Sequence, residues 1–257
     1  MLMNTLTSIR NSKVAANKQF TLTNFTLPSS LLLYSTVLED EVDTTNNKAG
    51  EYVSKTYCIS YIGSLIDSNG PPSITNANIG SYKFIDSSTY GTMTNSLTFN
   101  SGGAVTICFW FKLTSTTGNG SVKFPFIFGQ TFGTNVITPE FNYNASGVLT
   151  NLFVYCLNTS GARFTPNTSL LNNWVHFAIV VSHGTVAKAY INNTLFNSLN
   201  GTNNFNAGST MVDGRIPQGT TTVPFGNVTE IRIYNTALTA TQIGNIYNWS
   251  GVGQPVF

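Results

Sequence analysis

The chain contains few charged side chains. Only 9% of its 257 residues are Asp, Glu, Lys or Arg, and the formal net charge is +2, whereas about a quarter of the residues of an average protein are charged. The sequence has no cluster of Lys and Arg that would neutralise a phosphate backbone, which argues against nucleic-acid binding. Hydrophobic residues make up 41% and aromatic residues 12%, enough to build a core and to argue against disorder.

Cysteine is equally scarce. Cys58, Cys108 and Cys156 make an odd number, so at least one thiol stays unpaired within a single chain. Cys108 and Cys156 lie in apolar, strand-like runs, where a free cysteine is usually a small hydrophobic core residue; a disulfide or a metal site is the alternative. The sequence contains no C-x-x-C pair and no His/Cys spacing of a zinc site, so we predict no structural zinc.

Long apolar runs are absent. No stretch approaches the roughly 18 apolar residues of a membrane span, and residues 1–20 lack the apolar segment of a secretory signal. This N-terminal segment instead carries Arg10, Lys13 and Lys18 without any acidic residue. We interpret it as a basic, extended arm that docks on a partner; a transit peptide is the alternative.

What the sequence does contain is a β-meander, which is clearest between residues 174 and 196. An apolar run and an alternating run are separated by His183-Gly184, and Asn192-Asn193 separates the second run from a third. Two-residue hairpin loops need positive φ, which Gly adopts freely and Asn tolerates. The segment therefore predicts three antiparallel strands and an all-β fold.

Further strands are expected wherever short apolar runs alternate with turn residues. They lie at residues 31–34, 57–63, 81–85, 95–99, 104–113, 123–130, 149–157 and 227–235. The run at 104–113 is apolar on both faces, which indicates a central strand, and the run at 149–157 is also interpreted as a buried strand. In the last run Glu230 alternates with Arg232, which predicts an exposed charge pair that adds little stability.

One short helix is predicted near the C-terminus. Thr239 is a good N-cap residue and Gln242 follows it three positions later, the pattern of a capping box. Ile243, Ile246 and Tyr247 then recur at helical spacing and would pack one apolar stripe against the sheets. Many short strands and a single helix are typical of a β-sandwich or jelly roll.

Three motifs follow one another in order. They are the apolar strand AVTICFWFKL, the W-x-H-x-A strand of Trp174, His176 and Ala178 with its hairpin, and the closing segment VTEIRIYNTALTATQIGNIYN. Together they resemble the concanavalin A-like, laminin-G-like jelly-roll domains over about residues 95–250. The resemblance implies a two-sheet antiparallel β-sandwich with one short C-terminal helix, in which the histidine packs and hydrogen-bonds. The family more often has Gly at the position of Asn193, but Asn also tolerates this turn.

The resemblance also implies a domain organisation. We expect an N-terminal arm at residues 1–28, a laminin-G-like jelly-roll domain at residues 29–250 and a C-terminal tail at residues 251–257. Folds of this kind host lectins, adhesion modules, glycosidases and structural domains alike, so the function has to be argued from individual residues.

Paired catalytic carboxylates are missing from the sequence. Glucanases of this fold carry an E-x-D-x-x-E strand, which points its acids into one cleft, and this motif does not occur here. The densest acidic run, residues 39–43, is predicted to form a solvated loop, while Glu140 and Glu230 are isolated. No nucleophilic triad is indicated either, because His176 lies within a strand and His183 at a hairpin tip. We therefore predict no enzymatic activity.

A glycan-binding site is sought where an aromatic side chain stands beside amide and carboxylate groups. The long loop at residues 200–222 meets this requirement with Asn203, Asn204, Phe205 and Asp213. An ordinary loop without a binding role is the alternative.

Calcium is the cofactor to consider, because many relatives bind it through Asp, Asn and carbonyl oxygens. Asp40 and Asp43 in one loop, or Asp213 in another, would hold it. No spacing in the sequence matches a calcium motif, so we predict no cofactor and keep calcium as the alternative.

The expected function is that of a non-enzymatic structural or interaction module. The fold is typical of extracellular proteins, yet the sequence shows no secretory signal and no evident disulfides. A virus particle that assembles inside a cell and is exposed after release would account for both observations. Our leading hypothesis is a virion structural or surface protein (minor capsid, decoration or fibre-associated) that contacts other structural proteins. A glycan-binding lectin or adhesin, extracellular or at the cell surface, is the alternative, and a glycosidase ranks third.

Overall fold

The described part of the chain is built mainly of β-strands. The computed structural model describes residues 30–35, 37–38, 59–62, 65–67, 70–74, 79–84, 90–93, 97–98, 103–116, 122–123, 137–156, 162–203, 210–211, 215–216 and 225–249. The strands are β1 (Leu31–Ser35), β2 (Val37–Leu38), β3 (Ile59–Ile62), β4 (Leu65–Asp67), β5 (Ile79–Phe84), β6 (Tyr90–Met93), β7 (Leu97–Thr98), β8 (Ala104–Ser115), β9 (Val122–Lys123), β10 (Ile137–Tyr143), β11 (Val148–Cys156), β12 (Ala162–Phe164), β13 (Thr168–Ser169), β14 (Val175–Ser182), β15 (Thr185–Ile191), β16 (Thr194–Asn203), β17 (Thr210–Met211), β18 (Arg215–Ile216) and β19 (Phe225–Tyr234). The helix α1 spans Ala240–Tyr247.

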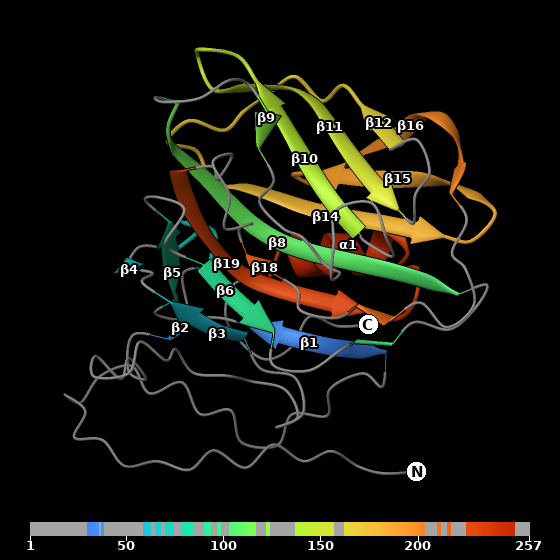
Figure 1. Cartoon of the computed structure of the whole chain (residues 1–257), viewed down its shortest axis with the longest axis horizontal. Helices are drawn as coiled ribbons and strands as arrows, with labels where there is room; N and C mark the ends of the chain where they lie inside the picture. Colours follow the sequence, from blue (N-terminus) through green and yellow to red (C-terminus); the bar gives the residue numbers. More distant parts are fainter. Residues whose placement is uncertain are drawn as a thin grey trace, which may run out of the picture.

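The larger sheet runs in the order β16-β15-β14-β8-β19-β5-β2, with β1 added beside β19 and β4 beside β5 (Figure 1). Every strand pair in it is antiparallel. The predicted meander forms β14, β15 and β16, and the strand that is apolar on both faces, β8, lies in the middle between β14 and β19. Both predictions are confirmed.

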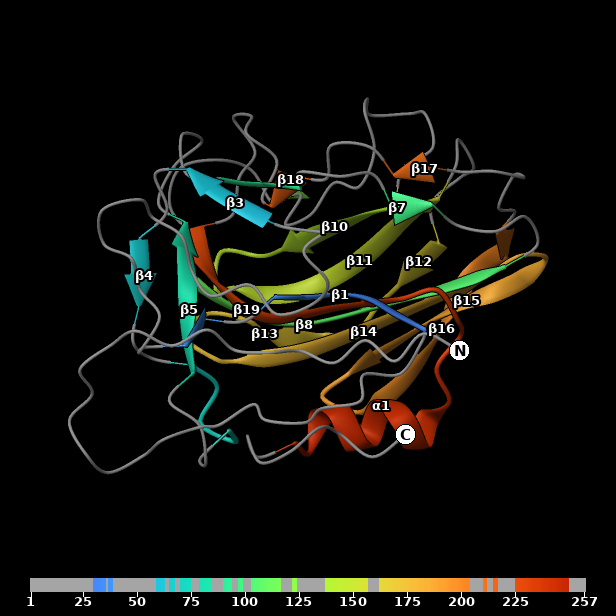
Figure 2. The ribbon, with the colours of Figure 1, turned by 90° about the horizontal axis from the view of Figure 1, so that it is seen from below.

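A second, smaller sheet runs in the order β12-β11-β10-β9, with β13 paired to β11. This small sheet and α1 lie on opposite sides of the larger sheet (Figure 2). Two short ribbons, β18-β6-β3 and β17-β7, lie on the same side as the small sheet. The predicted two-sheet sandwich with one short helix is therefore correct. The predicted arm at 1–28, the tail at 251–257 and the strand segment at 124–130 lie outside the described residues.

The core between the two sheets is built around phenylalanines from both layers. Phe109 on β8 lies against Phe177 on β14, with ring centroids 5.2 Å apart, and Phe141 on β10 reaches across to Phe177 at 4.9 Å. Phe111 meets Phe141 edge-on at 5.5 Å. All four side chains are buried, and truncating one such ring to alanine costs about 3–5 kcal/mol.

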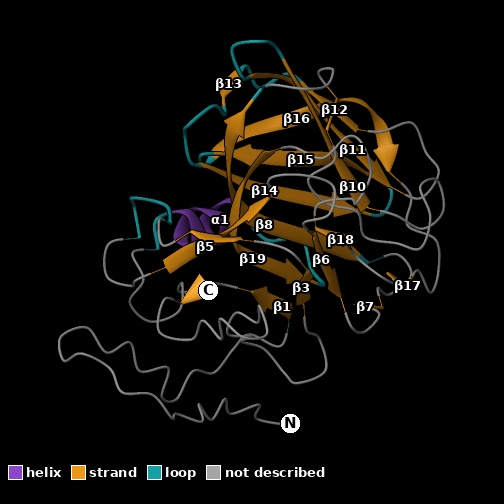
Figure 3. Ribbon diagram, turned by 60° about the vertical axis from the view of Figure 1, so that its left-hand side comes forward, coloured by secondary structure: helices purple, strands orange, loops and turns teal. Residues whose placement is uncertain are grey.

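The opposite face of the larger sheet is covered by α1 (Figure 3). Thr239 caps the helix, and the reciprocal hydrogen bonds with Gln242 form the predicted capping box. Ile243 and Ile246 are buried and belong to a cluster with Cys108 of β8. The helix gives the larger sheet two buried faces, which explains why the central strand β8 is apolar on both faces over most of its length.

Glu230 and Arg232 form a buried ion pair on this covered face. Arg232 Nη2 donates to Glu230 Oε2 at 2.8 Å, and both side chains are almost fully buried. The prediction of an exposed pair is wrong for two physical reasons. The backbone at Glu230 has φ +56° where the register with β8 shifts, and this bulge redirects its side chain. Trp249, which follows α1, stacks over Arg232 at 4.7 Å.

The two predicted hairpin turns are present. Gly184 has φ +67°, while Asn192 and Asn193 have φ +47° and +63°. Asn192 also fastens the hairpin to β14, because its side-chain oxygen accepts from the backbone N–H of His176 at 2.9 Å. Asn therefore replaces Gly in this turn without loss of the meander.

Candidate functional site

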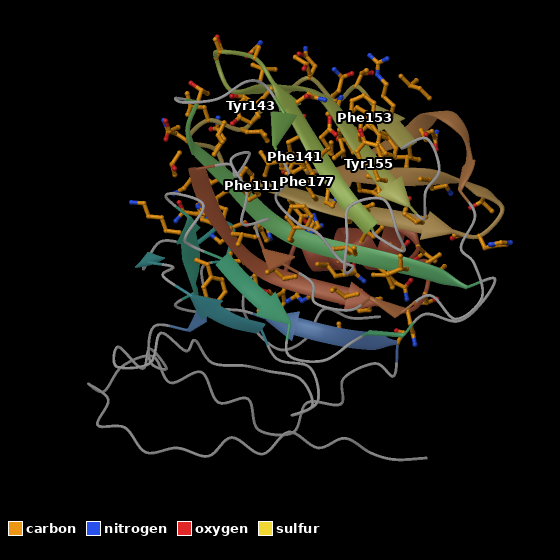
Figure 4. The ribbon with its side chains drawn as sticks, in the orientation of Figure 1. Phe111, Phe141, Tyr143, Phe153, Tyr155 and Phe177 are labelled. Carbon is orange, nitrogen blue, oxygen red and sulfur yellow. The ribbon has the colours of Figure 1, made fainter. Side chains whose placement is uncertain are left out.

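The outer face of the small sheet carries an exposed aromatic pair. On β11, Leu152 and Val154 point into the core and are fully buried, whereas Phe153 and Tyr155 between and beyond them are partly exposed. Their rings lie nearly parallel, with centroids 6.3 Å apart and 15° between the ring planes. Figure 4 shows both rings along β11, apart from the labelled core residue Phe177. The two stacked rings form a partly exposed aromatic platform on the sheet.

Polar residues on the neighbouring strands frame this platform. In the strand register Phe153 lies opposite Glu140 of β10 on one side and opposite Arg163 of β12 on the other. One step along the strands, Asn142 lies opposite Asn151. Because neighbouring strands are about 4.8 Å apart, the backbones at Glu140 and Arg163 are about 10 Å apart. We call these five residues together with Tyr155 the β11 face.

On the β10 side, both carboxylate oxygens of Glu140 accept hydrogen bonds from neighbouring side chains. Asn142 Nδ2 donates to Oε1 at 2.9 Å, and the Tyr155 hydroxyl donates to Oε2 at 2.8 Å. Burial, together with the hydrogen bond to Glu140 and the charge of Glu140, raises the pKa of Tyr155 to about 12. The phenol therefore stays protonated near neutral pH and its ring is fixed on the sheet.

On the β12 side, Arg163 is exposed and makes a single side-chain hydrogen bond within the described residues. Its Nε donates to Asn151 Oδ1 at 3.0 Å. The guanidinium carbon lies 5.8 Å from the centre of the Phe153 ring, near the outer limit of a cation–π contact and too far to stack closely on it. Within the described residues its terminal N–H groups make no hydrogen bond.

The chemistry of this arrangement is compatible with a sugar ligand. A sugar ring presents C–H groups on its face and hydroxyls on its rim, which can meet an aromatic platform flanked by a few fixed polar groups. Hydrolysis needs two carboxylates that share the scissile bond. Among the described residues of the β11 face, Glu140 is the only carboxylate, and both of its oxygens are occupied.

The loop predicted to bind glycans is described only at its start. Asn203 ends β16 and pairs with Thr185, while Asn204, Phe205 and Asp213 lie outside the described residues. The glycan site expected from these four residues therefore stays a prediction.

The predicted metal ligands and the basic arm also lie outside the described part. This holds for Asp40, Asp43 and Asp213, and for Arg10, Lys13 and Lys18. Within the described residues no group of three or more His, Cys, Asp or Glu could hold a metal ion. In the same residues no helix is long and apolar enough to span a membrane.

His176 packs inside a second aromatic cluster, beneath α1. Its ring centre lies 5.1 Å from that of Trp110 and 5.7 Å from that of Tyr247. Trp249 packs in the same cluster and is buried. Burial, with a smaller contribution from the charge of Arg232, lowers the pKa of His176 to about 3. The imidazole is a neutral packing residue, as expected, but neither ring nitrogen has a hydrogen-bond partner within the described residues, so the expected hydrogen bond of the ring is not found there.

Cys108 is a free, buried cysteine, as predicted. Burial raises the pKa of its thiol to about 12, so the thiol is unreactive near neutral pH. Cys156 ends β11, and Cys58 lies outside the described residues.

Sequence reasoning missed the β11 face because the run at residues 149–157 was interpreted as buried on both faces. A signal was present: Leu152 and Val154 alternate with Phe153 and Tyr155, the pattern of a half-buried strand. Glu140 was noted only as an isolated acid, because the strand that contains it was not predicted.

Comparison with known proteins gives a family and a fold. A family model described as the concanavalin A-like lectin/glucanases superfamily matches residues 86–244, which is more than half of the chain. No curated protein matches the sequence.

Solved structures with a similar fold include binding domains of toxins. The botulinum neurotoxin serotype G binding domain has a TM-score of 0.63 at 14% identity, covering 83% of this chain and 50% of that chain. The binding domain of Paraclostridial mosquitocidal protein 1 has a TM-score of 0.60 at 15% identity, covering 85% and 52%. The chain thus spans about half the length of these structures, and at such low identity the likeness concerns the fold alone. Sheet order, capped helix and family match lead to one conclusion: the chain belongs to the concanavalin A-like lectin/glucanase superfamily.

Proposed function

We propose that this protein is a non-enzymatic binding module that binds a glycan through the β11 face. The observation that carries the proposal is the parallel pair of Phe153 and Tyr155, partly exposed and framed by hydrogen-bonded polar side chains from β10 and β12. A hydrogen-bonded frame holds the rings in place before a ligand arrives, which lowers the ordering cost of binding.

The fold comparisons support a binding role in general. The similar solved structures are themselves described as binding or receptor-binding domains. They do not identify a ligand for this chain. The virion role inferred from the sequence remains a prediction, and its test is separate: the protein should be found by mass spectrometry in purified particles, and its absence would end that hypothesis.

Glycan binding is tested with a glycan array and with titration calorimetry on the best ligand. We expect the wild type to bind and Phe153→Ala to lose about tenfold or more in affinity, since losing a stacked, buried ring contact costs over 1 kcal/mol. Leu199→Ala is the matched control, because Leu199 is an exposed apolar side chain (65% exposed) outside the β11 face, on β16 at the edge of the larger sheet.

Two further variants sharpen the result. Asn203→Ala tests the loop that the sequence favoured, and under our proposal it leaves the affinity unchanged. Thermal unfolding of each variant checks that the fold is kept. Loss of binding in Asn203→Ala with full binding in Phe153→Ala would refute the β11 face as the site. Mass spectra of the glycans after incubation with the protein should show no cleavage products.

A further inference from the structure

We propose that the glycan bound by the β11 face carries an anionic group, a carboxylate or a sulfate ester, and that Arg163 binds it. This inference rests on the proposed function, because it specifies the ligand of the same site. The starting observation is that the β10 side and the β12 side of the aromatic pair offer different hydrogen-bonding groups.

The β12 side offers donors. Arg163 uses Nε to bond Asn151 Oδ1, while its terminal N–H groups and the Asn151 amide N–H groups make no hydrogen bond within the described residues. A neutral sugar hydroxyl both donates and accepts, whereas a carboxylate or sulfate only accepts. A row of donors centred on a planar guanidinium fits two oxygens of one anion, which is the arrangement in which arginine binds most strongly.

The positive charge of Arg163 is not neutralised within the described part of the chain. The ion pair found there joins Arg232 to Glu230, on the other side of the larger sheet. Glu140 lies across Phe153, with about 10 Å between the backbones, and its two oxygens are already occupied by Asn142 and Tyr155. Among the described residues, the β12 side of the face therefore carries an exposed, unpaired positive charge that an anion can neutralise.

The β10 side completes the orientation of the ligand. Asn142 donates its amide N–H to Glu140, and its Oδ1 makes no hydrogen bond within the described residues. A sugar hydroxyl can donate to this oxygen. The ring then lies over Phe153 and Tyr155, with hydroxyls toward β10 and the anionic group toward β12.

The test compares charged oligosaccharides with their neutralised counterparts. The probes are oligogalacturonides and sialyllactose, which carry carboxylates, their methyl esters, and chondroitin sulfate oligosaccharides with their desulfated forms. We expect at least one charged probe to bind about tenfold or more tightly than its neutral form, because a hydrogen bond to a charged partner contributes about 1.5–3 kcal/mol. The carboxylate and sulfate arms show which anion is preferred.

Variants assign the effect to Arg163. Arg163→Gln should bind the charged and neutral forms equally, and Arg163→Lys should keep part of the preference. Lys188→Gln removes one positive charge from an exposed position on β15 and is the control for a general charge effect, so it should leave the preference unchanged.

The possible results separate the two proposals. If the wild type prefers neutral forms, or binds both forms equally, the anionic inference is overturned while glycan binding stands. If Lys188→Gln reduces the preference as much as Arg163→Gln, a diffuse charge effect replaces the specific contact. If Phe153→Ala keeps full binding, or no probe and no array glycan binds, the proposed function fails and this inference fails with it.

Discussion

The buried imidazole of His176 makes the stability of this protein dependent on pH. Both ring nitrogens are buried without a hydrogen-bond partner within the described residues, and the pKa is lowered from 6.5 to about 3, first by burial and then by Arg232. In the unfolded chain the same group binds a proton near pH 6.5. Between about pH 6.5 and pH 3 the unfolded state therefore holds one more proton than the folded state, and the free energy of unfolding falls as the pH falls.

The magnitude follows from the shift. A difference of about 3.5 pKa units at about 1.36 kcal/mol each gives about 5 kcal/mol, lost at up to about 1.4 kcal/mol per pH unit. The loss of free energy of unfolding begins as the pH falls below about 6.5 and is complete at about pH 3. Since whole domains are stable by about 5–15 kcal/mol, His176 alone accounts for a large share of acid unfolding.

The assay is urea unfolding of wild type and His176→Phe from pH 7 to pH 3. The difference between their free energies of unfolding should shift by several kcal/mol in favour of the variant as the pH falls, because phenylalanine has no proton to gain. His183→Gln removes the only other histidine, which is exposed at a hairpin tip, and should follow the wild type. A constant difference between wild type and His176→Phe across this pH range would refute the reasoning.

Three further predictions concern the scaffold, each measured as the free energy of unfolding at pH 7. Arg232→Met should cost about 3–5 kcal/mol, because it leaves a buried carboxylate without its partner; a loss below 1 kcal/mol would contradict a buried pair. Gly147→Ala should cost clearly more than Gly184→Ala, whose penalty is the left-handed backbone alone, about 1–2 kcal/mol. Both have positive φ, but a Cβ at 147 would lie 2.5 Å from Leu171 Cβ, whereas a Cβ at 184 meets nothing within 4 Å; equal costs would be evidence against this packing. Thr239→Ala should cost about 1 kcal/mol by removing the cap of α1, and an unchanged stability would show that the cap is dispensable.

Local signals predicted the elements that depend on local chemistry. The β14–β16 meander follows from turn residues that accept positive φ, and α1 follows from the pairing of Thr239 with Gln242. Strand β10 was missed because Pro139 and Glu140 interrupt its pattern. Its place in the fold comes from the hairpin with β11 and from the core contact of Phe141 with Phe177, which is distant in sequence.

Such local signals do not predict the buried ion pair or the β11 face. A positive φ at Glu230 is a rare backbone state for a side chain of this kind, and it arises from a register shift between two strands. The β11 face gathers side chains from three strands, and the cross-strand register that aligns Glu140, Phe153 and Arg163 is a property of the folded sheet. The charge and shape of the site therefore became visible only with the structure.

The most direct test of the account is a chemical-shift titration of the isotope-labelled protein with the oligosaccharide that binds most tightly. If the β11 face is the binding site, the largest amide shifts will fall on β10, β11 and β12, together with the aromatic resonances of Phe153 and Tyr155. Shifts concentrated in residues 200–222 or on α1, with the small sheet unchanged, would contradict the central claim that this module binds glycans through the small sheet.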